Sequence, residues 1–138
     1  MITSTVKYLG DLRTESVHLQ SGNSILTDAP KDNFGKGEAF SPTDLLATSL
    51  ANCMFSIMGI VAKRDGITGI DGAIAEVTKV MYQEPRRVGE VHVKITFPNN
   101  AYSEKDKKIY ENAAKTCPVA KSLHPDLIQN IQFVWPNN

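Results

Sequence analysis

The strongest constraint on the fold of this chain is a long apolar segment, residues 41–64. It opens with the signals of a helix N-terminus: Ser41 as the cap, Pro42 at the first helical position and Asp44 completing a capping box. Gly66 supplies the end of the helix. We therefore expect one buried helix over residues 41–64, with its apolar stripe formed by Leu46, Leu50, Cys53, Ile57, Ile60 and Val61.

The same segment favours a soluble protein that associates with a second copy. Asn52, Ser56 and Gly59 interrupt the apolar run, and it falls short of the roughly 20 residues of a membrane span. A chain of 138 residues builds only one modest core, so a single domain over residues 1–138 is expected. The helix is too apolar for that core to cover alone, which predicts an obligate homodimer.

Charge and the N-terminal residues limit the partners and the location. Fifteen basic residues balance fifteen acidic ones, so no overall field attracts nucleic acid or an anionic membrane, and neither is an expected partner. The first residues show neither the basic and apolar regions nor the cleavage site of a secretory signal. We therefore expect a cytoplasmic location.

The rest of the chain indicates an α+β fold. Residues 103–117 open with a capping box and place Ile109, Ala113 and Cys117 in line on a second helix, which Pro118 should end. Residues 27–40 are rich in Gly, Asp and Pro and predict a long loop. Strands are expected from alternation or β-rich composition, with the first two paired and the next two paired, at residues 2–8, 12–19, 73–82, 91–97 and 127–135.

Cys117 stands directly before Pro118, which suggests that it caps a short helix over residues 118–124. Free amide hydrogens and the positive end of the helix dipole favour a thiolate there, and Lys121 adds charge to the same turn. The alternative is a small buried residue at a helix junction. A cysteine pair in a reducing compartment is reactive, metal-binding or inert.

Cys53 receives no such help, because mid-helix amides are already bonded and an apolar stripe raises the pKa of a thiol. A cation from elsewhere in the fold has to stabilise its thiolate. Arg13 is the candidate, since it shares a strand face with Val17 and Leu19. The alternative for Arg13 is a solvated strand charge beside Glu15.

The histidines give little support to a metal site. His18, His92 and His124 are not forced inward by their patterns, and no paired C-x2-C or H-x3-H spacing accompanies the two cysteines. A zinc site of Cys53, Cys117 and two histidines is therefore disfavoured. We expect neither a metal nor a cofactor.

Two motifs together resemble one known family. The first motif is a proline, an acidic residue and a leucine followed about ten residues later by a cysteine, in "FSPTDLLATSLANCMFSIMGI". The second is a cysteine followed by a proline, in "CPVAKSL". They occur in the expected order, and an arginine lies in the strand region before them. This combination resembles the OsmC/Ohr family of osmotically induced and organic hydroperoxide resistance proteins, over nearly the whole chain.

The resemblance implies an OsmC-like fold: antiparallel sheets wrapped around long central helices in an intertwined homodimer, with active sites at the subunit interface. It also implies a cysteine-based peroxidase of the stress response, acting on a small organic hydroperoxide. By position, Cys53 would be the peroxidatic thiol, Cys117 the resolving thiol and Arg13 the activating guanidinium. An external dithiol, lipoyl-type or small, would be the reductant. Apolar residues near Cys53 would favour an organic substrate: Leu50, Met54, Phe55 and Ile57.

One position departs from the family pattern. Where peroxidase members carry a glutamate that partners the arginine, this chain has Thr43, with Asp44 as the adjacent acid. Asp44 lies roughly 13 Å from Cys53 along one helix, so it cannot reach that sulfur within the helix. The departure leaves a second hypothesis open, a non-enzymatic OsmC-like dimer that binds a ligand or senses redox state. Helix capping favours Cys117 as the more acidic thiol, whereas the family pattern makes Cys53 the attacker; we follow the family pattern.

Overall fold

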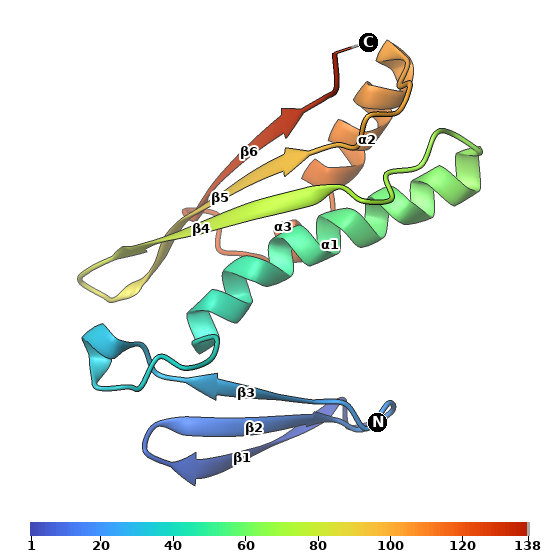
Figure 1. Ribbon diagram of the computed structural model, residues 1–138. Helices are drawn as coiled ribbons and strands as arrows, with labels where there is room; N and C mark the ends of the chain where they lie inside the picture. The colour runs from blue at the N-terminus through green and yellow to red at the C-terminus, as the bar shows by residue number, and fades with distance from the viewer. Residues whose placement is uncertain (138) are drawn as a thin grey trace. The chain divides into compact units, whose positions relative to one another are not determined.

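The computed structural model describes residues 1–137 and divides into two compact units, residues 1–46 and residues 47 onward. Each unit contains one three-stranded sheet, and the helices belong mainly to the second unit (Figure 1). The fold is thus mixed α+β with two sheets and helices, as the sequence predicts. The expectation of a single domain over residues 1–138 stays a prediction.

The first unit is an antiparallel sheet of β1 (Ser4–Gly10), β2 (Arg13–His18) and β3 (Ser24–Asp28), in that order (Figure 1). The predicted β1–β2 hairpin is present. Asp11 and Leu12 make its turn with φ values of 53° and 63°, the left-handed backbone that matches the twist of a two-residue hairpin.

Strand β3 corrects the sequence prediction, which assigned Thr27 and Asp28 to a loop. Its five residues, Ser24–Asp28, show no alternation, and pairing with β2 makes them a strand. Beyond it, the segment 29–40 contains the short 3₁₀-helix η1 (Lys31–Asn33) and folds back on the end of β3. The amide of Gly37 donates to the Ala29 carbonyl at 3.2 Å.

Gly35 is required by this fold-back. Its own amide donates to the Pro30 carbonyl at 3.0 Å, and a Cβ at this position would lie 1.7 Å from the Ala29 carbonyl oxygen. Backbone atoms cannot move aside as the end of a side chain can. The close approach of residues 29 and 35 therefore depends on a missing side chain.

The first unit has no hydrophobic core of its own. The residues buried in it are all polar: Thr27, Asp28 and Ser41. Strand β1 was predicted to be half-buried, but its residues are exposed apart from the half-buried Gly10. Its sheet and the adjoining loops expose a set of large apolar side chains: Ile2, Val6, Tyr8, Leu9, Leu12, Leu19, Ile25, Leu26, Phe34 and Phe40.

The second unit contains the sheet β4 (Ile74–Tyr82), β5 (Arg87–Thr96) and β6 (Ile128–Val134), in that order. Strands β4 and β5 form the predicted antiparallel pair, and β6 runs parallel to β5. The helices are α1 (Pro42–Asp65), which begins in the first unit, α2 (Glu104–Lys115) and α3 (Pro118–Ser122) (Figure 1).

Strand β5 alternates as predicted. Val91, Val93 and Ile95 are fully buried and belong to one core with the buried residues of α1 and α2, whereas Lys94 and Thr96 are exposed. Helices thus cover one face of the sheet, and the other face is polar. Ring stacking continues the core beyond the strands, with the Phe97 and Trp135 centroids 3.7 Å apart.

The buried face of α1 differs from the predicted stripe. Leu50 and Val61 are buried as expected, but Leu46 and Ile60 are 41% and 58% exposed, and Cys53 is half-buried. The buried residues of the helix are Ala47, Leu50, Ala51, Met54, Met58 and Val61, and all of them except Val61 belong to the hydrophobic core cluster. The helix is apolar on more than one side, so its period alone does not indicate which side the sheet covers.

The membrane criterion also corrects the sequence analysis. Helix α1 has 24 residues and a window with mean hydropathy 1.8, so by length and composition it is able to cross a membrane. A core helix of a soluble protein meets the same criterion. Here one face of α1 packs in the core of the second unit.

Helix α2 ends before Cys117, contrary to prediction. It stops at Lys115, and its buried residues are Tyr110 and Ala114. A proline excludes the preceding residue from the helical region, so the backbone at Cys117 is extended and Pro118 starts a new helix. Cys117 therefore lies between two helices.

Neighbouring side chains on β5 test the alternation. Ile95→Ala removes a fully buried side chain and is expected to lower the free energy of unfolding by about 2–5 kcal/mol. Thr96→Ala, one residue along on the exposed face, should change it by less than about 0.5 kcal/mol. Urea unfolding of both variants measures the difference. Equal losses would contradict the assignment of faces.

Candidate functional site

Cys117 caps helix α3, as the sequence predicts. Its backbone is extended, with φ −66° and ψ 151°, and Pro118 occupies the first turn. The Cys117 Sγ accepts a hydrogen bond from the Ala120 amide at 3.5 Å. Pro118 has no amide hydrogen to donate. The free amides of the first turn are therefore those of the residues after it, and the Cys117 sulfur bonds to one of them.

Cys53 reaches the same turn from the middle of α1. Its Sγ accepts a hydrogen bond from the Val119 amide at 3.5 Å, and its thiol interacts with that of Cys117. Both cysteines are unpaired thiols in this structure. Two consecutive amides at the start of α3 thus hold the two sulfurs together, which the sequence could not show for Cys53.

The electrostatics of Cys117 differ from the sequence prediction. Burial raises the pKa of its thiol above the ordinary value, the Ala120 and Val119 amides pull that pKa down, and the neighbouring Cys53 raises it further. The net pKa shift is upward. The expectation that helix capping places this sulfur to ionise was therefore wrong, because burial outweighs two weak amide contacts.

The apolar side chains expected around Cys53 divide into two groups. Leu50 and Met54 are fully buried in the core, so they cannot line a surface open to substrate. Phe55 and Ile57 pack against that core while remaining partly accessible. Of the four expected residues, only Phe55 and Ile57 are therefore accessible enough to contribute to an apolar surface.

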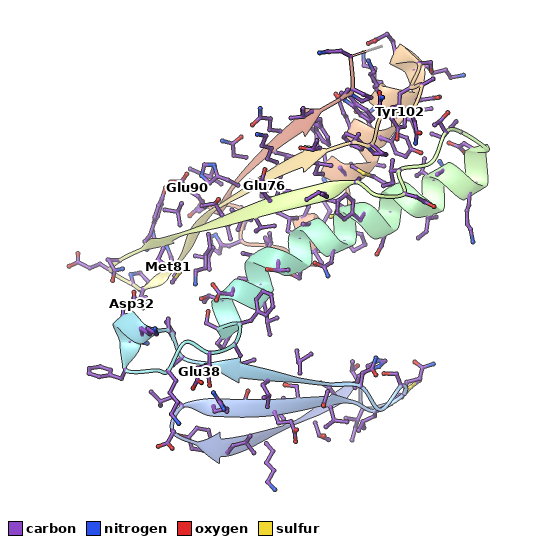
Figure 2. The ribbon with its side chains drawn as sticks, in the orientation of Figure 1. Asp32, Glu38, Glu76, Met81, Glu90 and Tyr102 are labelled. Atoms are coloured by element: carbon purple, nitrogen blue, oxygen red, sulfur yellow. The ribbon has the colours of Figure 1, made fainter. Side chains whose placement is uncertain are left out.

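In the first unit, Arg13 lies in a carboxylate cluster rather than beside Glu15. Its Nε and Nη2 donate to the two Asp28 carboxylate oxygens at 2.7 and 2.8 Å, and Nη2 also donates to Glu38 at 3.2 Å. Glu38 lies on the loop that follows β3 (Figure 2). Sequence analysis missed both acids because the β2–β3 pairing was not recognised.

Asp44 acts locally as the partner of a helix cap. Its Oδ2 accepts the Ser41 amide at 3.0 Å, while the Asp44 amide donates to the Ser41 hydroxyl at 3.1 Å. These reciprocal bonds are the predicted capping box. Thr43, at the position of the family glutamate, has its hydroxyl 3.3 Å from that of Ser41.

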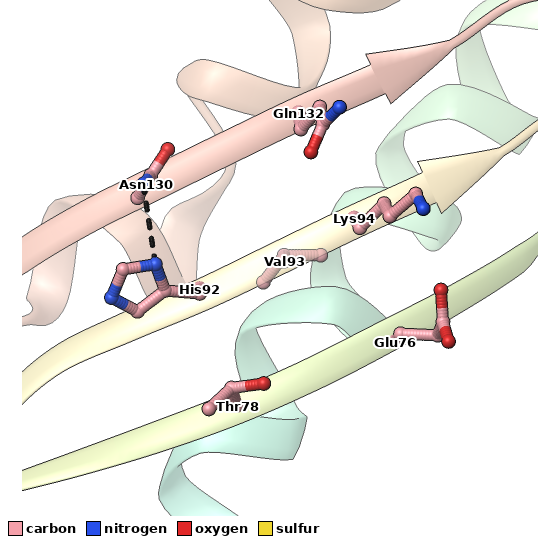
Figure 3. A pocket seen from close by; sticks show the side chains of 7 residues that line it. All are labelled: Glu76, Thr78, His92, Val93, Lys94, Asn130 and Gln132. Atoms are coloured by element: carbon pink, nitrogen blue, oxygen red, sulfur yellow. Dashed lines mark hydrogen bonds between the residues drawn. The ribbon is translucent and has the colours of Figure 1, made fainter.

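A separate polar hollow of about 320 Å³ lies on the open face of the second sheet (Figure 3). Strands β4, β5 and β6 all contribute to it, and the Asn130 amide group lies 3.2 Å from His92 Nδ1. None of the sequence-predicted site residues lines this hollow. Among residues 1–137, no group of three or more His, Cys, Asp or Glu side chains is arranged to hold a metal ion.

Comparisons with known proteins agree with the fold. The model of the family described as "OsmC-like protein" matches residues 35–129. A crystal structure of a candidate osmotic stress induced and detoxification response protein from Psychrobacter arcticus is 62% identical, with 96% of each chain covered and a TM-score of 0.91.

More distant structures share the fold. An organic hydroperoxide resistance protein OsmC from Legionella pneumophila is 16% identical, with 99% of this chain and 98% of that chain covered and a TM-score of 0.71. An OsmC like protein from Mycoplasma pneumoniae is 23% identical, with coverage of 97% and 96% and a TM-score of 0.74. No curated protein sequence matches significantly.

The burial of Cys117 predicts slow alkylation. At pH 8 iodoacetamide should modify Cys117 of the native protein more slowly than Cys117 of the urea-unfolded protein, because both its accessibility and its thiolate fraction are lower when folded. Mass spectrometry of the labelled peptides over time gives the two rates. The Cys53→Ser variant is the control that removes the neighbouring thiol. A faster native rate would contradict the raised pKa.

Proposed function

Because this chain belongs to the OsmC-like protein family, we propose that it is a thiol-dependent peroxidase that reduces organic hydroperoxides. One observation carries the proposal: the sulfurs of Cys53 and Cys117 accept hydrogen bonds from adjacent amides of one turn. A sulfenic acid formed on one thiol would then have the other within its immediate surroundings. The Legionella structure, which is that of an organic hydroperoxide resistance protein, adds support at the level of the fold.

The proposed first step takes place at Cys53. Its thiolate attacks the outer oxygen of the hydroperoxide, the O–O bond breaks, and the alkoxide leaves as an alcohol after taking up a proton. Cys53 becomes a sulfenic acid. The Val119 amide, already directed at this sulfur, supplies a hydrogen bond to the attacking thiolate.

The second step uses Cys117. Its thiolate attacks the sulfenic sulfur, hydroxide leaves as water after protonation, and a disulfide forms. An external dithiol, lipoyl-type or small, then reduces the disulfide by thiol exchange and is itself oxidised. The raised pKa of Cys117 keeps it protonated while Cys53 reacts, which suits a resolving thiol better than an attacking one.

We assign two further roles by family resemblance. Arg13 is the proposed activating guanidinium, and Asp44 is the proposed acid beside the position of the family glutamate. We also keep the cytoplasm as the proposed location. The intertwined homodimer, with sheets wrapped around central helices, is the proposed assembly.

The exposed apolar surface supports a second copy of the chain as the partner. A unit of 46 residues whose buried side chains are all polar leaves a three-stranded sheet without a core. Such a sheet is not stable alone in water. Leu46 and Ile60 on α1 add exposed apolar area in the same chain.

Paired serine variants test the division of labour between the thiols. After one equivalent of cumene hydroperoxide and a sulfenic-acid trap, Cys117→Ser should carry the adduct at Cys53, whereas Cys53→Ser should stay reduced. Mass spectrometry locates the adduct. The reverse pattern would overturn the assignment of roles. Equal, slow oxidation of both variants would favour a non-enzymatic dimer that senses redox state or binds a ligand.

Sedimentation tests the proposed dimer. Analytical ultracentrifugation at micromolar concentration should give twice the chain mass of 15.2 kDa. The Val6→Asp variant places a charge on the exposed apolar side of β1 and should weaken association, whereas Lys7→Asp, its neighbour on the same strand, is the matched control. A stable monomer of the unmodified chain would contradict the proposal.

A further inference from the structure

We propose that Asp28 is a positioning residue for Arg13, in addition to Asp44, the acid proposed from the family pattern. The inference rests on the proposed function, in which Arg13 activates the Cys53 thiol. It adds a residue that neither the motifs nor the comparisons assign. Arg13, Asp28 and Glu38 all lie within the first unit.

Strand register places the two side chains together. Arg13 and Asp28 are directly opposite each other in the β2–β3 pair, so they project from the same face of the sheet. Arg13 follows the tight β1–β2 turn, and its backbone is held by pairing with both Gly10 and Asp28. Both ends of the ion pair therefore start from fixed strand positions.

The contact is bidentate and one side of it is buried. Arg13 Nε and Nη2 meet the two Asp28 oxygens at 2.7 and 2.8 Å, the parallel fork that fixes the plane of a guanidinium. Asp28 is 1% exposed, whereas Arg13 is 29% exposed. A buried carboxylate of this kind is a rigid anchor for the more accessible arginine.

Besides the two Arg13 nitrogens, a backbone amide also donates to the Asp28 carboxylate. The Glu38 amide donates to Asp28 Oδ2 at 3.0 Å, and the Asp28 amide donates to the Phe40 carbonyl at 3.1 Å. The hydrogen bonds from Arg13, followed by that from the Glu38 amide, lower the pKa of Asp28 despite the opposing effect of burial. Asp28 therefore stays charged at neutral pH and cannot release Arg13 by protonation.

This arrangement determines which part of the guanidinium is available. Nε and Nη2 are used by Asp28, and the exposed Glu38 also takes Nη2. Within residues 1–137, Nη1 has no hydrogen-bond partner. Asp28 thus leaves one defined edge of Arg13 for an anion, whereas the Asp44 carboxylate is bonded to the Ser41 amide of its own cap.

The sign of a pKa change separates positioning from simple charge. If Asp28 only contributed a negative charge, its replacement by asparagine would favour the Cys53 thiolate and lower the pKa of that thiol. If Asp28 orients Arg13, the same change removes the ordered cation and raises it. If Asp28 had only a structural role, its replacement would change the melting temperature but would not raise the pKa of the Cys53 thiol.

The experiment measures iodoacetamide alkylation of Cys53 against pH in the Cys117→Ser background, where only one thiol reacts. Asp28→Asn should raise the midpoint by about one pH unit, so that the rate near pH 7 falls about tenfold. Arg13→Gln should have a similar effect. The alkylation midpoint of the double variant should be no higher than that of Arg13→Gln alone, because Asp28 acts through Arg13. A fall or no change in the midpoint for Asp28→Asn would overturn the proposal.

Two further variants keep the test specific. Asp65→Asn breaks another bidentate pair, in which Arg64 contacts Asp65 at 2.8 and 3.2 Å at the end of α1, and should leave the midpoint unchanged. Asp28→Glu retains the charge but displaces it by one methylene, so it should raise the midpoint by a smaller amount. It replaces Asp28→Asn if the latter does not fold, and an unchanged midpoint would then overturn the proposal.

Turnover of cumene hydroperoxide with dithiothreitol is measured separately on the unmodified chain. Absence of turnover would overturn the proposed peroxidase function, while the alkylation profiles still report whether Asp28 positions Arg13. Normal turnover with an unshifted Asp28→Asn profile would overturn only the role of Asp28. The two failures are therefore distinguishable.

Discussion

Covering helix α1 is the requirement on which the rest of the second unit depends. Its apolar residues extend around more of its circumference than one sheet face occupies, and the residues that pack inward leave Leu46 and Ile60 exposed. Hydrophobic burial is the main favourable contribution to folding, so this helix organises β5, α2 and α3 around it. Cys53 is half-buried on this helix, beside its fully buried face.

Local patterns predicted most elements because each carries its own signal. The alternation of Val91, Val93 and Ile95 identified β5, and Ser41 with Asp44 identified the start of α1. Strand β3 has no comparable signal, since its five residues become a strand only by pairing with β2. The buried face of α1 was misjudged for the same reason, because another element decides which side is covered.

The candidate site shows the same division between local and tertiary information. The position of Cys117 as a helix cap follows from Pro118, and the sequence alone predicts it. Its pKa depends on burial by distant residues, which reverses the direction that capping suggests. The role of Asp28 could not be predicted from the sequence, because Arg13 and Asp28 are brought together only by the register of the β2–β3 pair.

The fold-back at Gly35 has a consequence for how this chain can vary. Loops ordinarily tolerate substitution and insertion better than the strands they connect. Here any side chain at position 35 would strike the Ala29 carbonyl, and the same loop carries the Glu38 amide to Asp28. Substitution at position 35 is therefore restricted by backbone contact, and a change there would be transmitted to Arg13 through Asp28 and Glu38.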